Sequence, residues 1–445
     1  MNTTSNKPRA LALQLLNKIF LEGAYANIAL AQALADVTLN DQDRRFLTEL
    51  VYGTVKAKGT LDWLIEKVAN KGMKKIDGRV LNALRLGAYQ LFYLDKVPAS
   101  AACNETVELV KHFGHTGMVN FTNGIMRTLA RDKDRLTFPA RTDNEPLWVA
   151  LTYQHPLWLV ERWHYRYGME NAIKICEFDN KQPKFSFRVN TLKTSRNGLQ
   201  AKMQEAGYEV TPSQWSKEGL LGTKIGSTAE LMKKFGKLIY IQDESSMLVA
   251  DILNPQPGET VIDLCSAPGG KTTHLAQKMA NQGKIIASDI HQHKLELIKS
   301  NVKRLGVNIV ETYLQDATQQ VAEWVDKADR VLVDAPCSGL GVLGRRPEAR
   351  WTKEEKKLSQ FPPLQKKILA NAATYVKQGG YLVYSTCTLE QDENTRVVAA
   401  FLQEHPEFSK VGFKHPLTGE TVEELQLLPQ QDDVDGFYIC LMQKR

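Results

Sequence analysis

The chain lacks three features that would assign it to well-defined classes of protein. Its six cysteines form no C-x-x-C pair, so the sequence indicates neither a zinc ribbon nor a dithiol redox motif, and we expect no metal. No apolar run approaches the ~20 residues that span a bilayer, and residues 11–16 are too short and too polar for a signal peptide. We therefore expect a cytoplasmic protein with reduced cysteines.

Length and charge indicate a soluble multidomain protein that binds a polyanion. The 445 residues are enough for two or three domains, and the formal net charge is +7. The basic excess lies in residues 1–235, whereas residues 236–445 are slightly acidic. This distribution fits a nucleic acid held mainly by the first half of the chain. Nothing in the sequence requires more than a monomer.

Residues 1–140 are predicted to form an all-helical domain. Short polar connections between the helical patterns imply a compact bundle. Residues 43–46 and 84–91 resemble the antitermination factor NusB, and that resemblance implies an RNA-binding bundle. The helical patterns cover residues 10–35, 41–55, 61–68, 80–94, 102–112 and 122–129.

Residues 141–235 are predicted to form a linker helix and a small α/β subdomain of the RRM-like kind. A charged, proline-containing linker leads to an aromatic-rich helical segment at 147–167. Residues 184–190 alternate like a strand, and a helix at 197–206 and a strand at 208–210 follow.

From residue 236 to 445, strands and helices alternate. This pattern predicts a mostly parallel, Rossmann-like sheet covered by helices on both faces, with a late antiparallel strand at 437–442. The predicted strands are 260–264, 284–288, 308–313, 330–333 and 380–384, and the predicted helices are 272–279, 291–305, 317–324, 354–376 and 391–404.

Residues 261–273 read as a strand, a small-residue turn and the start of a helix, the arrangement that binds cofactors in α/β sheets. Gly269 and Gly270 lack a Cβ, so a ligand can lie against their backbone. A Walker loop would need glycine where Cys265 stands, and no G-x-G-x-x-G follows the strand. The loop therefore does not match either pyrophosphate-binding motif.

Polar or reactive residues follow all five predicted parallel strands, where such sheets bind ligands. Asp289 is placed for a ribose and Asp316 for an adenine edge, and S-adenosylmethionine supplies both groups without a phosphate. Lys271 and the helix N-terminus suit its carboxylate, and Asp263 suits its ammonium. The strand-end residues are Cys265 to Lys271, then Asp289, Asp316, Asp334 with Cys337, and Cys387.

Cys337 and Cys387 indicate what is methylated. Cytosine C5 becomes nucleophilic once a thiolate adds to C6, a step that needs a cysteine in a thiolate-stabilising setting. Asp334 could hold N3 and the exocyclic amine of that base. The alternative is that both cysteines are buried structural residues.

Residues 263–271, 334–339 and 385–388 resemble the motifs of RNA 5-methylcytosine methyltransferases, as do residues 346–351 and 435–437. Together with the NusB-like segment, the chain resembles the bacterial ribosomal RNA small subunit methyltransferase B family over nearly its full length. Many members of the family carry alanine where Ser266 stands. The resemblance implies a class I S-adenosylmethionine-dependent fold.

The resemblance also implies roles for single residues. Cys387 would be the nucleophile and Cys337 would assist release, although DNA enzymes use the cysteine of a Pro-Cys motif, here Cys337. Asp334 would serve the cofactor, the base or both. The implied cofactor-binding residues are Cys265, Ser266, Ala267, Pro268, Gly269, Gly270, Lys271, Asp289, Asp316 and Asp334.

By the same resemblance, the substrate would be a cytosine of 16S rRNA, number 967 in the family's rRNA numbering. The base must be single-stranded or flipped out, because pairing hides C6. The strand at 188–192, which begins with Arg188, would line the RNA groove beside Arg345, Arg346 and Arg350. Alternatives are a 5-methylcytosine methyltransferase for another rRNA site or tRNA, and an RNA-binding antitermination or assembly factor with a vestigial catalytic domain.

Overall fold

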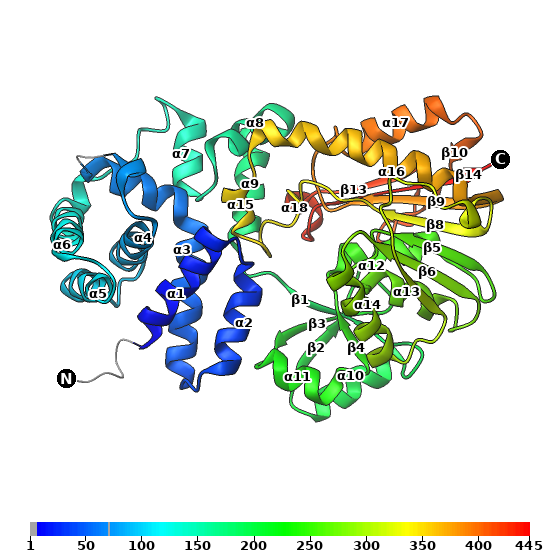
Figure 1. The fold of residues 1–445 in the computed structure, drawn as a ribbon, viewed down its shortest axis with the longest axis horizontal. Helices are drawn as coiled ribbons and strands as arrows, with labels where there is room; N and C mark the ends of the chain where they lie inside the picture. Colours follow the sequence, from blue (N-terminus) through cyan, green and yellow to red (C-terminus); the bar gives the residue numbers. More distant parts are fainter. Residues whose placement is uncertain (1–6, 70–71) are drawn as a thin grey trace. The chain divides into compact units, whose positions relative to one another are not determined.

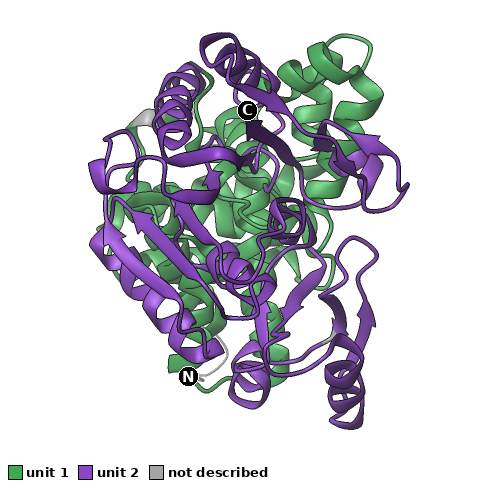
Figure 2. Cartoon of the chain, turned by 90° about the vertical axis from the view of Figure 1, so that its right-hand side faces the viewer, with its two compact units in different colours: residues 1–182, 343–355 green, residues 183–342, 356–445 purple. Residues whose placement is uncertain are grey.

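The computed structural model describes residues 7–69 and 72–445. Contacts within the chain divide it into two compact units, shown in green and purple in Figure 2. Unit 1 contains Met1–Gln182 and the later segment Leu343–Glu355, and unit 2 contains Pro183–Val342 and Lys356–Arg445. The described part of unit 1 is helical, whereas unit 2 holds two sheet-containing parts (Figure 1).

Unit 1 has the all-helical character that the sequence predicts. The segment predicted as one helix at 10–35 is two helices, because the chain turns at Gly23 with φ +76°. Asn40 caps α3 by accepting a hydrogen bond from the Asp43 amide, and α3 then continues through both helical patterns predicted at 41–55 and 61–68. The helices are α1 Lys7–Glu22, α2 Ala26–Asp36, α3 Asp41–Val68, α4 Gly78–Tyr93, α5 Ala99–Lys111, α6 Thr116–Arg131, α7 Glu145–Thr152, α8 Leu157–Tyr167, α9 Met169–Asn180 and α15 Ala349–Thr352.

The segment Leu343–Glu355 anchors itself in unit 1 through Arg350 and Trp351. The Arg350 side chain is fully buried and donates hydrogen bonds to the Asp179 carbonyl at 2.8 Å and the Asn180 side chain at 2.7 Å. The Trp351 indole donates to the Val55 carbonyl at 2.6 Å. The prediction that Arg350 lines an RNA groove is therefore wrong, because its guanidinium is buried and donates hydrogen bonds to acceptors inside the unit.

Unit 2 begins with a small α/β subdomain around a four-stranded antiparallel sheet of order β2-β3-β1-β4. Phe187 and Val189 of β1 pack with Leu199 and Leu231 in its core. The sequence pattern predicts β1, α10 and β2 but not the later elements. The elements are β1 Phe185–Val189, α10 Arg196–Glu205, β2 Glu209–Pro212, β3 Gly219–Lys224, α11 Thr228–Phe235 and β4 Ile239–Ile241.

The rest of unit 2 is a Rossmann-like layered domain. Its sheet has the order β10-β14-β9-β8-β5-β6-β7, with β13 paired to β14. Strands β5 to β9 are parallel and β14 runs antiparallel to β9, as predicted from the sequence. The strands are β5 Thr260–Leu264, β6 Lys284–Asp289, β7 Val310–Leu314, β8 Ala328–Asp334, β9 Val376–Thr386, β10 Phe408–Lys410, β13 Glu424–Leu427 and β14 Phe437–Lys444.

Alternating side chains along these strands form two cores, one on each face of the sheet. Val261 and Leu332 pack with α12 (Glu244–Leu253), α13 (Gly270–Lys278) and α14 (Gln292–Leu305). Ile262 and Val331 pack on the other face with α16 (Phe361–Tyr375) and α17 (Thr395–Glu404). Figure 1 shows these two helix layers on opposite sides of the sheet. Both strand faces are buried, as parallel sheets require.

The prediction of a helix at 317–324 is wrong, because only a 3-10 turn, Ala322–Trp324, forms there. Asp316 instead closes a tight turn by accepting hydrogen bonds from the amide and hydroxyl of Thr318. The side-chain amide of Asn371 on α16 also donates hydrogen bonds to the Ala317 and Gln319 carbonyls, which are then not available to accept bonds within a helix. Within the described ranges 7–69 and 72–445, no helix combines the length and apolar character needed to span a membrane.

Arg350→Ala should destabilise the protein by about 3 kcal/mol or more, because it leaves several buried acceptors without a donor. Urea unfolding followed by circular dichroism measures this loss. Arg346→Ala is the matched control, since Arg346 is exposed and should change stability by less than about 0.5 kcal/mol. Equal stabilities for the two variants would contradict the anchoring role of Arg350.

Candidate active site

Sheet register brings the predicted strand-end residues to one edge of the sheet. Asp334 ends β8 and is the register partner of Ser385 on β9. Leu264 of β5 is paired with Val333, so Cys265 lies level with Asp334. The strand order changes direction between β5 and β8, the point at which open α/β sheets bind ligands.

The loop between β5 and α13 is held by its neighbours. Cys265 and Gly269 have φ of +60° and +94°, and a Cβ on Gly269 would lie 3.3 Å from Ile298 of α14. The amide and hydroxyl of Ser266 both donate to the Ser288 carbonyl of β6 at 2.9 Å. Burial raises the pKa of Cys265 above its ordinary value, so this thiol stays protonated.

Asp263 is a buried carboxyl group with one oxygen left without a partner. Its Oδ2 accepts a hydrogen bond from the Thr272 hydroxyl at 2.6 Å, whereas no described residue bonds its Oδ1. Burial raises the pKa of Asp263 to about 7, and the nearby Asp334 charge adds to the shift. A buried acceptor without a donor fits the ammonium group of an amino-acid moiety. The unpartnered oxygen of Asp263 supports the fit of S-adenosylmethionine to the site, because that cofactor carries such an ammonium group.

Asp289 and Asp316 lie at the ends of the adjacent strands β6 and β7. One oxygen of Asp289 accepts from the His291 amide at 3.0 Å, and Lys294 lies 3.8 Å from the same oxygen. One oxygen of Asp316 is taken by Thr318. The side chain of Ile290, directly after Asp289, is 56% exposed and offers an apolar surface beside the carboxylate. Ile290 is not predicted as a site residue, because a lone isoleucine carries no sequence pattern.

Lys271 and Asp334 form a partly buried ion pair. The ammonium of Lys271 lies 2.7 Å from Asp334 Oδ2 and over the ring of Phe437. The Ser385 hydroxyl donates to the other oxygen at 2.9 Å. Burial opposes the Lys271 charge, but Asp334 outweighs it and raises the pKa of Lys271. A charge on Cys387 is a further and smaller cause of the same shift in the pKa of Lys271.

Cys337 and Cys387 lie together, with 3.3 Å between their sulfur atoms. Their two loops are joined by a 2.7 Å hydrogen bond between the hydroxyls of Ser338 and Thr388. The Gly341 amide also donates to the Cys387 carbonyl at 3.0 Å. The hydrogen bond with Cys387, together with burial, raises the pKa of Cys337. Both thiols are partly accessible, unlike Cys103, Cys176 and Cys440.

Glu393 holds the loop that carries Cys337 through hydrogen bonds. It is not predicted as a site residue from the sequence. It accepts hydrogen bonds from the Ser338 amide and the Gln365 side chain, both at 2.9 Å. Gln365 also donates to the Pro336 carbonyl at 3.0 Å. A glutamate in a polar loop carries no sequence signal of this role.

The prediction that Arg188 lines an RNA groove is also wrong. Arg188 is fully buried in unit 2, and its guanidinium donates to the Gly270 carbonyl at the start of α13. Of the four arginines predicted for the groove, only Arg346 is exposed, while Arg345 is half-buried.

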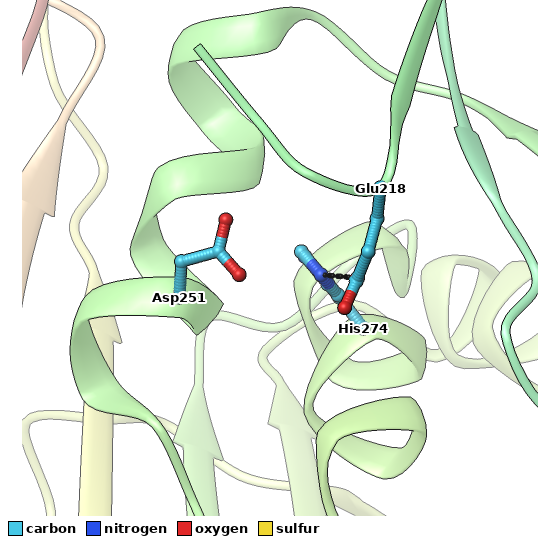
Figure 3. A group of neighbouring side chains, drawn as sticks. All are labelled: Glu218, Asp251 and His274. Atoms are coloured by element: carbon cyan, nitrogen blue, oxygen red, sulfur yellow. Dashed lines mark hydrogen bonds and ion pairs between the residues drawn. The ribbon is translucent and has the colours of Figure 1, made fainter. Parts of the chain in front are cut away.

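Glu218, Asp251 and His274 form the one cluster of possible metal ligands found among the described residues (Figure 3). Lys278 makes ion pairs with both carboxylates, at 2.9 Å to Glu218. Burial alone would raise the pKa of Glu218, but hydrogen bonds from His274 and Lys278 hold it at about 2. A lysine of the chain thus already supplies the positive charge at this cluster.

Family models cover all three parts of the chain. The model described as 16S rRNA methyltransferase RsmB/F matches residues 250–443. The NusB family model matches residues 6–131, and the RsmF/B-like ferredoxin-like domain matches residues 155–225. These matches confirm the predicted fold class, including the helical NusB-like bundle and the small α/β subdomain.

Individual proteins are similar over most or all of the chain. The protein of Bacillus subtilis (strain 168) named probable ribosomal RNA small subunit methyltransferase B is 40% identical, covering 98% of each chain. The crystal structure of PH0851 has a TM-score of 0.86 and 29% identity, over 98% of this chain and 99% of that one. The structure of NSun6 from Pyrococcus horikoshii with SFG has a TM-score of 0.57 and 25% identity, over 65% and 98%.

The sheet order and the loop after β5 define a methyltransferase with a Rossmann-like fold. More narrowly, the chain belongs to the ribosomal RNA small subunit methyltransferase B family, since the identity extends over its full length. The family resemblance inferred from the motifs is thereby confirmed.

Asp263→Asn should flatten the dependence of stability on pH. Because the folded pKa is about 7, above the unfolded value, the native state favours the protonated form, and this stabilisation is lost as pH rises towards 7. The stability of the wild type relative to the variant should fall by about 1.4 kcal/mol per pH unit between the two pKa values and level off above. Urea unfolding at about pH 4.5, 6 and 8 measures it, and a constant difference would refute the raised pKa.

Proposed function

We propose that the protein transfers a methyl group from S-adenosylmethionine to C5 of a cytosine in small-subunit ribosomal RNA. The observation that carries this proposal is the pair of thiols 3.3 Å apart. It occurs at the same edge of the sheet as the ion pair between Lys271 of α13 and Asp334 at the end of β8. Cytosine C5 chemistry requires a nucleophilic thiol, whereas methyl transfer to a nitrogen or oxygen does not.

The residues proposed to hold the cofactor are Cys265 to Lys271, Asp289, Asp316 and Asp334. The unpartnered oxygen of Asp263 supports binding of the ammonium group, and the amino-terminal end of α13 supports binding of the carboxylate. Ile290 and Asp289 suit the adenosine. When bound, S-adenosylmethionine supplies an electrophilic methyl group.

Cys387 is proposed as the nucleophile. Its thiolate, stabilised by Lys271, adds to C6 of cytosine, and the electron pair of the C5–C6 double bond makes C5 nucleophilic. Asp334 holds N3 and the exocyclic amine, and we keep a second role for it at the cofactor. After the methyl group has been added, a base removes the C5 proton, the double bond re-forms and the Cys387 thiolate leaves.

Cys337 is proposed to assist the release step. Its raised pKa keeps this thiol protonated, which suits a part in proton transfer and disfavours attack on the base. The 3.3 Å between the sulfurs allows Cys337 to act at the same C5–C6 edge as Cys387. This argues against the assignment of Cys337 as the nucleophile, the arrangement of the DNA enzymes.

Ribosomal RNA as the substrate is supported by the names of the relatives and by the basic excess of residues 1–235. We propose that residues 1–140 bind RNA, residues 141–235 form the linker and small subdomain, and residues 236–445 carry out catalysis in the cytoplasm. A cytosine at position 967 of 16S rRNA, presented unpaired, is the proposed target.

Cys387→Ala should abolish transfer of labelled methyl groups into small-subunit rRNA, because no thiolate can add to C6. Cys337→Ala should instead accumulate a covalent protein–RNA adduct, visible as a band of reduced mobility on a denaturing gel. Cys440→Ala is the control, since this buried thiol lies on β14 and should leave transfer unchanged. Residual activity of Cys387→Ala, or no label in any RNA from wild type, would contradict the proposal.

Lys271→Met should lower methyl transfer at neutral pH by roughly 10- to 100-fold, because the Cys387 thiolate loses its nearby cation. Part of the rate should return at about pH 9, where the thiol ionises without help. Lys271→Arg keeps the charge and should show a smaller loss. A pH–rate profile that falls uniformly, with no recovery at high pH, would remove the thiolate-stabilising role.

A further inference from the structure

Arg188 is a buried cation in the small α/β subdomain that has no part in the chemistry described above. It lies on β1, an inner strand of the four-stranded sheet. Phe187 and Val189, its neighbours, point into the subdomain's own core. Since side chains alternate along a strand, Arg188 leaves the opposite face, and there it reaches α13.

The guanidinium of Arg188 holds one face of α13. It donates hydrogen bonds to the Gly270 carbonyl at 2.7 Å, the Thr273 hydroxyl at 2.9 Å and the Gln277 side chain at 2.9 Å. These three residues recur at spacings of three and four, so they lie along one stripe of the helix. Gln242 accepts a further hydrogen bond. The contact therefore begins at the residue that follows the left-handed Gly269.

Tyr240 closes the same contact from β4. The guanidinium groups of Arg188 and Arg304 both lie over its ring, at 5.2 and 5.6 Å from the ring centre. A Cβ on Gly270 would lie 3.0 Å from this ring, so the small subdomain packs directly on the loop–helix junction. A side chain at Gly270 would therefore crowd Tyr240 of the small subdomain.

An arginine with only a packing role at this buried position would lower the stability of the protein relative to an apolar side chain. All hydrogen-bond partners of Arg188 among residues 7–69 and 72–445 are neutral. Burial lowers the pKa of Arg188 to about 10, although the carboxylates of Glu218 and Asp251 partly offset that shift without bonding to it. Burying a cation without a paired carboxylate costs stability, and an apolar side chain would fill the space without that cost. What the guanidinium adds is several directed hydrogen bonds in a fixed plane, which set the position of the helix start.

We propose that Arg188 is a positioning residue for cofactor binding, so that the small α/β subdomain forms the rear support of the cofactor loop. Arg188 fixes the first turn of α13, whose amino-terminal end receives the cofactor carboxylate. The inference rests on the proposed function, since it presumes that this loop binds S-adenosylmethionine.

The test measures S-adenosylmethionine binding to the full-length protein without RNA, by titration calorimetry. Arg188→Lys keeps the charge but cannot reproduce the planar set of hydrogen bonds, so its Kd should rise roughly 10- to 100-fold. Hydrogen exchange of the amides in residues 270–274 should accelerate in this variant. Arg196→Lys is the matched control, because Arg196 lies at the start of α10 in the same subdomain and donates to the Ser213 and Ser216 carbonyls, not to α13.

Thr273→Val provides a second variant of nearly equal volume that removes one acceptor of Arg188, and it should weaken binding in the same direction. Thermal unfolding of each variant separates a loss of folding from a loss of binding. If wild type binds and both α13-contact variants bind as tightly as Arg196→Lys, the positioning role is overturned while the proposed function stands. If wild type itself does not bind S-adenosylmethionine, the proposed function fails first.

Discussion

The ion pair between Lys271 and Asp334 is the interaction around which the candidate site is arranged. It joins the loop after β5 to the end of β8, across the point where the strand order reverses. The Lys271 side chain is largely withdrawn from water, and the neighbouring Asp334 carboxylate stabilises its charge. Ser385, the register partner of Asp334, extends the contact to β9 and so to the strand that precedes Cys387.

This pair divides the carboxyl edge of the sheet into two regions with different chemistry. On one side, Asp263, Asp289 and Asp316 lie at β5, β6 and β7, an acidic region suited to the amino group and ribose of a nucleoside cofactor. On the other side, the two thiols of Cys337 and Cys387 lie beyond β8 and β9, with 3.3 Å between their sulfur atoms. Asp334 stands on the boundary, which explains why sequence reasoning assigned it to both regions.

The sequence predicts the parts of this site that depend on strand order, because parallel strands deliver their end residues to a common edge. The bounds of β5 agree residue for residue, and the strand ends at Asp289, Asp334 and Cys387 follow from the same pattern. It does not predict the buried positions of Arg188 and Arg350, which the family resemblance placed at an RNA groove. Their burial depends on tertiary acceptors such as the Gly270 and Asp179 carbonyls, which no local pattern contains.

The central claim, that Cys387 attacks C6 of a cytosine, can be tested directly by trapping. A 16S rRNA fragment containing 5-fluorocytidine blocks loss of the C5 substituent, so the covalent intermediate should persist in the presence of S-adenosylmethionine. Protease digestion and mass spectrometry of the trapped complex identify the modified peptide. The account predicts a nucleotide adduct on Cys387, and an adduct on Cys337, or none, would contradict it.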